Sequence, residues 1–166
     1  MAAKSPVSGR FWVTCYTDAS YSQNDGGGWA FWLTGPDRRI VRHGPCPRWV
    51  KSSNGAELAA IFAAIYTARV EWKQRCRGVL VCSDSRFALE IAEGKHPMLA
   101  RKRKPADIDR LAQRIQETLL LGQMQIRARW VKGHQKARGA APFLNGECDR
   151  LSREARKSSR VAARKK

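Results

Sequence analysis

Residues 11–20, with the sequence FWVTCYTDAS, are a run of aromatic and β-branched residues that carries one acid, Asp18, near its end. Such residues favour strands, and the polar, glycine-rich residues 22–28 that follow favour a tight turn. Residues 28–34 form a second run of this kind, and residues 38–43 form a third after a short Gly-Pro turn. Three strands joined by short turns predict an antiparallel meander, with Asp18 closing its first strand.

After the meander the apolar residues recur at helical spacing, first at Leu58, Ile61, Phe62 and Ile65. The elements expected after the meander are a helix over 57–71, a buried strand over 79–82, a short helix over 86–93, a longer helix over 108–122, a strand over 124–130, a loop over 133–145 and a helix from about 146. Strands separated by helices join a sheet in parallel through right-handed crossovers. The sequence therefore predicts an α/β fold of order βββαβααβα, with a mixed five-stranded sheet flanked by helices.

The chain is long enough for one domain, and its most informative bulk property is a net charge of +18, from 32 Lys and Arg against 14 Asp and Glu. A surplus of this size indicates a polyanionic partner, with nucleic acid the first choice and an acidic membrane or a ribosomal-type scaffold as alternatives. We expect a disordered N-terminus over 1–10, one domain over 11–156 and a basic tail over 157–166.

The cysteines bear on the compartment. Five are present, with no spacing typical of zinc ligands or of a disulfide framework, which fits a reducing environment. No window has the length or hydropathy of a signal peptide or a membrane span. We expect a cytoplasmic protein with no membrane association.

Four acids, Asp18, Glu57, Asp84 and Asp149, each lie at the junction of an apolar element. Each also has a purely structural explanation: an Asx turn for Asp18, a capping box with Asn54 for Glu57, a helix cap for Asp84 and a favourable helix dipole for Asp149. Asp18 and Asp84 would emerge at one edge if their strands are parallel neighbours, which is where open α/β sheets place their ligands. A carboxylate cluster in so basic a protein fits hard divalent cations that clamp a phosphodiester.

His134 follows the fifth expected strand in the sequence Trp130-Val131-Lys132-Gly133-His134. A histidine in a loop is usually solvated. Beside a metal and carboxylate centre it would transfer protons near neutral pH.

Together these segments resemble the type 1 ribonuclease H family. The matching pieces, all in the family's order, are Thr17-Asp18-Ala19-Ser20, Asn54-Gly55-Ala56-Glu57-Leu58, Ser83-Asp84-Ser85, Val131-Lys132-Gly133-His134 and Asn145-Gly146-Glu147-Cys148-Asp149-Arg150-Leu151. The resemblance implies an endonuclease that hydrolyses the RNA strand of RNA/DNA hybrids by two-metal-ion catalysis with Mg²⁺, or Mn²⁺ as substitute, and leaves 5′-phosphate and 3′-hydroxyl ends. It also implies a monomer with no obligate protein partner.

The resemblance further implies a role for each matching residue. Asp18, Glu57, Asp84 and Asp149 would hold two metal ions, and His134 would assist proton transfer or product release. Hybrid binding, mainly through 2′-hydroxyls in the minor groove, would involve Ser20, Asn24, Ser52, Ser53, Asn54, Arg86 and Lys132. Ser52 stands where a pocket takes a DNA phosphate.

Three features depart from the family's pattern. Arg86 replaces the Gln that follows the Asp-Ser pair. The connector over 94–105 is too short for the basic handle of some bacterial members, so the cations at 101–104 and in the tail are candidates to replace it. The loop over 135–148 is longer than expected. A different nuclease or strand transferase, a non-catalytic hybrid-binding module and a basic RNA scaffold remain as alternative functions.

Overall fold

The computed structural model describes residues 9–133 and 139–164, with side chains as far as residue 158. Its strands are β1 (Phe11–Ser22), β2 (Gly26–Thr34), β3 (Arg39–Pro45), β4 (Cys76–Ser83) and β5 (Gln125–Trp130). Its α-helices are α1 (Ser53–Trp72), α2 (Arg86–Ala92), α3 (Ala106–Gly122) and α4 (Ala140–Arg164), and its 3-10 turns are η1 (Lys73–Arg75) and η2 (Pro97–Ala100).

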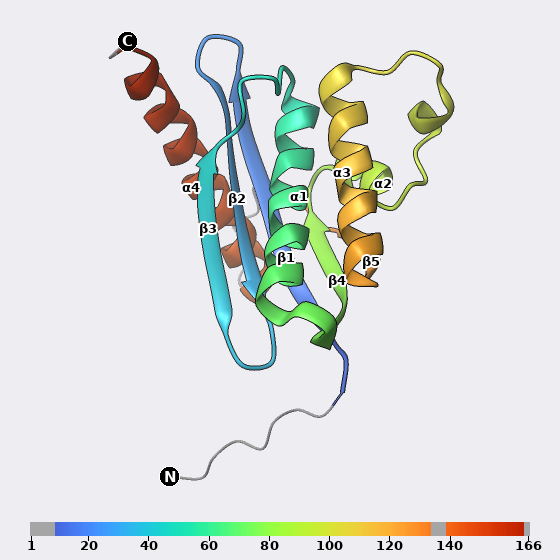
Figure 1. The fold of residues 1–166 in the computed structure, drawn as a ribbon. Helices are drawn as coiled ribbons and strands as arrows, with labels where there is room; N and C mark the ends of the chain where they lie inside the picture. Colours follow the sequence, from blue (N-terminus) through green and yellow to red (C-terminus); the bar gives the residue numbers. More distant parts are fainter. Residues whose placement is uncertain (1–8, 134–138, 165–166) are drawn as a thin grey trace.

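The strands form one sheet in the order β3-β2-β1-β4-β5 (Figure 1). β1 pairs antiparallel with β2, and β2 with β3, whereas β4 lies parallel to β1 and β5 parallel to β4. α1 and α3 lie on one face of the sheet and α4 lies on the other (Figure 1). The α/β fold with a mixed five-stranded sheet predicted from the sequence is confirmed.

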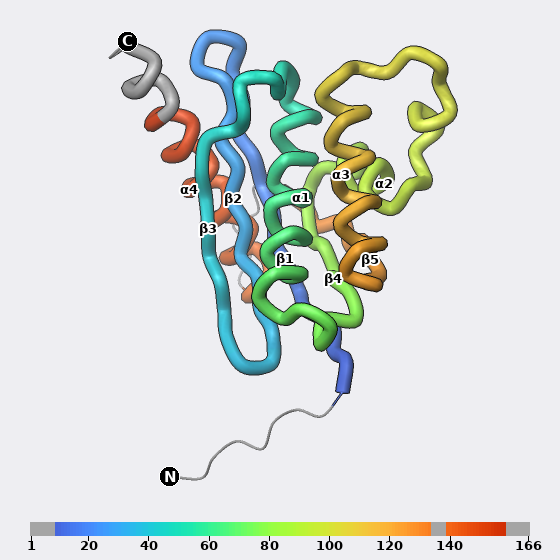
Figure 2. Tube along the Cα trace, in the orientation of Figure 1, coloured from blue at the N-terminus to red at the C-terminus, as the bar shows by residue number. Residues whose placement is uncertain are grey.

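The apolar stripes expected from the sequence form the core. Leu58, Ile61 and Ile65 of α1 are fully buried and Phe62 is partly buried, and four apolar residues at helical spacing on α3 are buried as well. Those positions are Ile108, Leu111, Ile115 and Leu119. The helices therefore cover the faces of the central strands. The end of the sheet toward which β1 and β4 run, and at which α1 begins, is where the candidate acids of these elements lie (Figure 2).

Asp18 does not close β1, contrary to the prediction. β1 continues four residues further because its antiparallel pairing with β2 extends to Ser22 opposite Gly26. The parallel pairing with β4 ends earlier, at Tyr16 opposite Cys82. Asp18 thus lies just beyond the parallel part of the sheet, so its expected placement at that edge holds although the strand is longer.

The last helix begins at Ala140 rather than near 146, so the second half of the expected loop is helical. Pro142 is tolerated there because a first helical turn has no acceptors for its N–H groups. As a result Asp149 lies in the third turn of α4, too far from the N-terminus for the helix dipole to explain it.

Trp130 is 45% exposed, whereas Trp12, Trp29 and Trp32 are partly buried. β5 is an edge strand of the sheet, so its last residue keeps one side open to solvent. None of the helices among the described residues is long and apolar enough to cross a membrane.

Candidate active site

Asp18 and Asp84 reach one edge of the sheet from adjacent parallel strands. The last pair in the β1 and β4 register is Tyr16 with Cys82, so each acid stands two residues beyond it. Glu57 joins them from the second turn of α1, the helix that begins at the same end (Figure 1). Two adjacent strands and the start of one helix therefore deliver three carboxylates to one place.

Among the described residues, these three acids are the group with metal-ligand atoms close together. One carboxylate oxygen from each lies within 4.8 Å of the other two. Asp18 is only 6% exposed, and the buried Oε2 of Glu57 has no hydrogen-bond partner in the described part of the chain. A buried acceptor without a partner costs free energy unless a cation or donor completes it.

The proximity of like charges changes how these acids titrate. Burial first, and then the charge of Asp84, raise the pKa of Asp18 from 3.8 to about 7, while the Ala19 N–H opposes the shift. Burial and the neighbouring charges of Asp18 and Asp84 likewise raise the pKa of Glu57. A divalent cation would relieve this repulsion, which is the electrostatic reason to regard the cluster as a metal centre.

The structural alternatives for Glu57 and Asp84 are wrong. The N-cap of α1 is Ser52, whose Oγ accepts from the Gly55 N–H at 2.9 Å. The N-cap of α2 is Ser85, whose side chain accepts from the Ala88 N–H at 3.2 Å. Neither acid caps a helix, so capping does not explain their positions.

Asp18 does accept the Ala19 N–H at 2.8 Å, as in a local turn. However, the strand continues through this residue to Ser22. The hydrogen bond orients the carboxylate rather than ending the strand.

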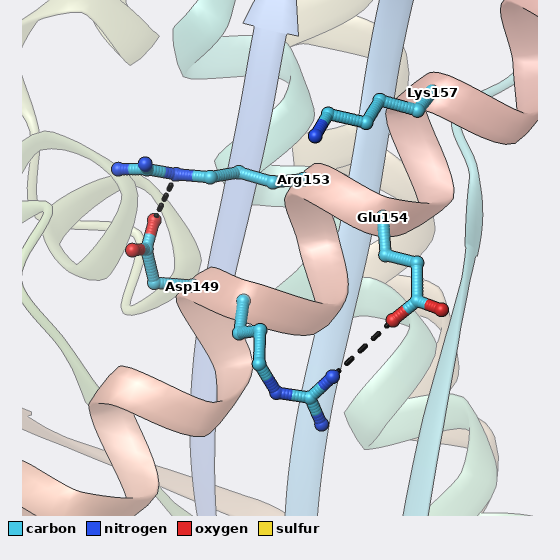
Figure 3. Close-up of a pocket in the computed structure, with 5 residues that line it drawn as sticks. Asp149, Arg153, Glu154 and Lys157 are labelled. Atoms are coloured by element: carbon cyan, nitrogen blue, oxygen red, sulfur yellow. Dashed lines mark hydrogen bonds and ion pairs between the residues drawn. The ribbon is translucent and has the colours of Figure 1, made fainter.

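Asp149, the fourth predicted acid, stands beside the cluster rather than within it. Its Oδ1 accepts a hydrogen bond from Arg153 Nε at 2.9 Å, one helical turn further along α4 (Figure 3). Its charge nevertheless contributes to the raised pKa values of Asp18 and Glu57, after burial and closer charges. The fourth acid is therefore near the other three and already has a cationic partner.

The family model of RNase H matches residues 11–157. The chain belongs to the RNase H family. A search of curated protein sequences gave no match.

Solved structures of the family share the fold. The N-terminal RNase H domain of a Mycobacterium tuberculosis protein superposes with a TM-score of 0.63 at 21% identity, over 92% of this chain and 98% of that one. RNase H1 from the archaeon Halobacterium salinarum gives 0.63 at 22% identity, over 89% and 99%. LC11-RNase H1, solved in complex with an RNA/DNA hybrid, gives 0.64 at 16% identity, over 89% and 98%. This chain thus shares the fold of these structures, and its membership of the RNase H family makes it a nuclease by family.

In this ribonuclease H the predicted histidine, His134, lies outside the described residues. The residues just before it are described, and Lys132 is exposed. Gly133 lies so close to Asp84 that a Cβ built on it would stand 2.2 Å from Asp84 Oδ2. The loop that carries His134 therefore leaves the sheet next to the carboxylate cluster.

The predicted substrate contacts surround the same end of the sheet. Asn24 is exposed in the turn between β1 and β2, and Ser53 and Asn54 are exposed on the first turn of α1. Ser20 is half-buried on β1, past Asp18, and Arg86 is exposed at the start of α2, past Asp84. All of these lie on elements that also carry or adjoin an acid of the cluster.

Ser52 differs from the other candidates because its hydroxyl is engaged within the protein. It accepts from the Gly55 N–H and donates to Asp107 Oδ2 at 2.7 Å. The same carboxylate oxygen accepts the Lys51 N–H at 3.1 Å. Asp107 thereby ties the start of α3 to the start of α1.

Sequence reasoning missed four contributors to the site: Asp107, Trp130, Gly133 and Arg153. Trp130 Nε1 donates to the Asp84 carbonyl at 3.0 Å, and the Arg86 guanidinium lies 4.4 Å from its ring centroid. The spacing of four residues between Asp149 and Arg153 on a helix was a readable signal for their ion pair. The contacts of Asp107 and Gly133 join distant segments and had no local signal.

Proposed function

We propose that this protein hydrolyses the RNA strand of RNA/DNA hybrids by two-metal-ion catalysis, with Mg²⁺ or Mn²⁺, and leaves 5′-phosphate and 3′-hydroxyl ends. Family membership supports the class of reaction. The single observation that carries the proposal is the trio of Asp18, Glu57 and Asp84, with oxygens within 4.8 Å and a buried Glu57 oxygen that has no partner among the described residues.

The donor set fits hard divalent ions. Carboxylate oxygens are the ligands that Mg²⁺ and Mn²⁺ prefer, and Asp18, Glu57 and Asp84 offer several of them in a partly buried, mutually repulsive group. Asp149 would complete the set from α4. Bound ions of this kind stabilise charge on the phosphodiester and lower the pKa of a water nucleophile.

The chain's own residues would hold these ligands in place. The Ala19 N–H orients the Asp18 carboxylate, and the Trp130 indole holds the Asp84 backbone through its carbonyl. We propose that His134, the residue that follows Gly133 in the sequence, transfers a proton during cleavage or product release.

Hybrid binding rests on charge and on position. The net charge of +18 supplies the attraction for a polyanion, and the related LC11-RNase H1 was solved with an RNA/DNA hybrid. We propose that Ser20, Asn24, Ser53, Asn54, Arg86 and Lys132 contact the hybrid mainly across its minor groove. Ser52 would donate to a DNA phosphate only by giving up its hydrogen bond to Asp107, because a hydroxyl has a single hydrogen to donate. We further propose that the protein acts as a monomer with no obligate protein partner.

The test of the two-metal proposal is the dependence of single-turnover hybrid cleavage on Mg²⁺, together with analysis of the product ends. We expect a steeper than hyperbolic rise in rate, and products whose RNA ends accept a 3′ extension and carry 5′-phosphate. Cleavage that persists in EDTA, or products with 2′,3′-cyclic phosphate, would contradict the proposal, because a cyclic product requires attack by the RNA's own 2′-hydroxyl.

A further inference from the structure

We propose that Arg153 is a positioning residue with two partners: it neutralises Asp149 in the metal-free protein and passes to a substrate phosphate when divalent ions occupy the carboxylates. The proposal rests on the function proposed above for this site. It concerns one ion pair on α4, between residues four positions apart.

The contact engages only part of the guanidinium. Arg153 Nε donates to Asp149 Oδ1 at 2.9 Å, and its two terminal NH₂ groups make no further hydrogen bond with the described residues. The Arg153 side chain is 54% exposed, and Asp149 is less so. In Figure 3 the guanidinium extends past the Asp149 carboxylate, away from the helix. The free edge of the guanidinium is thus available to a phosphate.

Arg153 also acts on the cluster itself. Burial and the charge of Asp84 raise the pKa of Asp18, and Arg153 is among the groups that lower it. The charge of Arg153, which pairs with Asp149, therefore also acts on Asp18, a second acid of the proposed metal centre. The positive charge of the guanidinium partly offsets the negative charge of the carboxylates, as a divalent ion would do more fully.

The rest of α4 shows that this arrangement is specific to one side of the helix. Arg150 is engaged by two acids, Glu147 at 3.0 Å and Glu154 at 3.3 Å. Lys157 extends from α4 toward the side of Asp149 and Arg153, while Glu154 points the other way (Figure 3). On one side of α4, Arg150 is fully engaged by Glu147 and Glu154. On the other side, Arg153 and Lys157 lie on the side of Asp149 (Figure 3).

These facts give an exchange with a defined direction. A divalent ion has twice the charge of a guanidinium and prefers carboxylate oxygens, so it displaces Arg153 from Asp149. The released guanidinium, which lies on the side of α4 next to the acids, can then bind a substrate phosphate through two parallel hydrogen bonds. Metal binding and hybrid binding are coupled through this side chain.

The test is the variant Arg153→Gln, with Arg150→Gln as the matched control and Arg153→Lys as the conservative variant. Mn²⁺ binding is measured calorimetrically on the full chain without nucleic acid, and KM and kcat are measured on an RNA/DNA hybrid. We expect Arg153→Gln to bind Mn²⁺ about three- to tenfold more tightly, because a competing positive charge is gone. The same variant should raise KM by a similar factor, because a phosphate contact is lost.

Tighter Mn²⁺ binding together with weaker substrate binding would indicate the proposed exchange, since a general disruption of the site would weaken the binding of both. Arg153→Lys should stay near the wild type in Mn²⁺ affinity, and Arg150→Gln should change neither quantity. Unchanged or weaker Mn²⁺ binding in Arg153→Gln would overturn the proposal. Because the calorimetric measurement needs no turnover, it still decides the role of Arg153 if the wild-type protein fails to cleave hybrids, which would instead refute the proposed function.

Discussion

Gly133 and Asp84 are in contact at the end of the sheet, although they are 49 positions apart in the sequence. A Cβ built on Gly133 would stand 2.2 Å from Asp84 Oδ2 and 3.1 Å from its Cγ. No side chain fits there without moving the carboxylate, whose oxygens belong to the Asp18 and Glu57 group. The glycine therefore sets the position of one acid of the cluster.

Gly133→Ala should reduce hybrid cleavage by at least about tenfold, because the added methyl group displaces Asp84 and a small misplacement at a reacting centre is costly. The free energy of unfolding should change by about 1 kcal/mol or less, since the loop lies at the surface. Gly146→Ala is the matched control, because a Cβ at that helical position meets nothing within 4 Å. Wild-type activity in Gly133→Ala would contradict the packing.

Without metal, the folded protein should lose stability as pH rises from about 4 to 7. The pKa of Asp18 is raised from 3.8 to about 7, so over this window the folded state keeps a proton that the unfolded chain has released, and the free energy of unfolding falls. The loss should be about 2 to 4 kcal/mol. It should be complete near pH 7 and should be reversed at higher pH by Mg²⁺.

Urea unfolding in EDTA at several pH values measures this dependence. Asp18→Asn should flatten it and should be more stable than the wild type at pH 8, because the buried charge is gone. A wild-type curve with no fall between pH 4 and 7 would show that the carboxylates do not repel one another as described.

Ser52→Ala should destabilise the fold by about 1 to 2 kcal/mol, because it removes the N-cap of α1 and a donor to the buried Asp107. Thermal melting followed by circular dichroism measures the loss. Ser53→Ala, at the exposed neighbouring position, is the control and should change stability by a few tenths of a kcal/mol. Equal melting temperatures for the two variants would contradict the claim that Ser52 stabilises the protein as the N-cap of α1.

Arg86→Gln should weaken hybrid binding and lower the slope of log K against log salt by about 1, because one phosphate contact is lost. Arg86 stacks 4.4 Å from the ring centroid of Trp130, beside Asp84. Arg127 stacks 4.4 Å from the ring centroid of Trp12, near the opposite end of β1. Arg127→Gln therefore removes an equivalent stacked charge away from the site and should leave the slope nearly unchanged. A slope equally affected by both variants would contradict a local contact at Arg86.

The sequence was enough to predict the order of the elements, the mixed sheet and the apolar stripes, because these follow from local periodicity. Leu111 and Ile115, for example, repeat at helical spacing and are buried as expected. The four acids were also predictable as candidates from the short motifs that carry them, although Asp18 lies within β1 and Asp149 in the third turn of α4 rather than at an element junction. The grouping of Asp18, Glu57 and Asp84 agrees with that prediction.

What the sequence could not provide came from contacts between distant segments. The length of β1 depends on its pairing with β2 as far as Gly26. The exposure of Trp130 depends on its place at an edge of the sheet. The roles of Gly133 and Asp107 arise from close approaches that no local pattern encodes.

The most direct test of the central claim is cleavage of one sequence presented as end-labelled RNA/DNA hybrid, double-stranded RNA, double-stranded DNA and single-stranded RNA, with Mg²⁺ and with EDTA. The wild-type protein should cut only the RNA strand of the hybrid, and only with Mg²⁺, whereas Asp18→Asn should bind the hybrid without cutting it. Hybrid cleavage by Asp18→Asn at the wild-type rate, or no metal-dependent cleavage by the wild type, would contradict the assignment of the carboxylates as the catalytic centre.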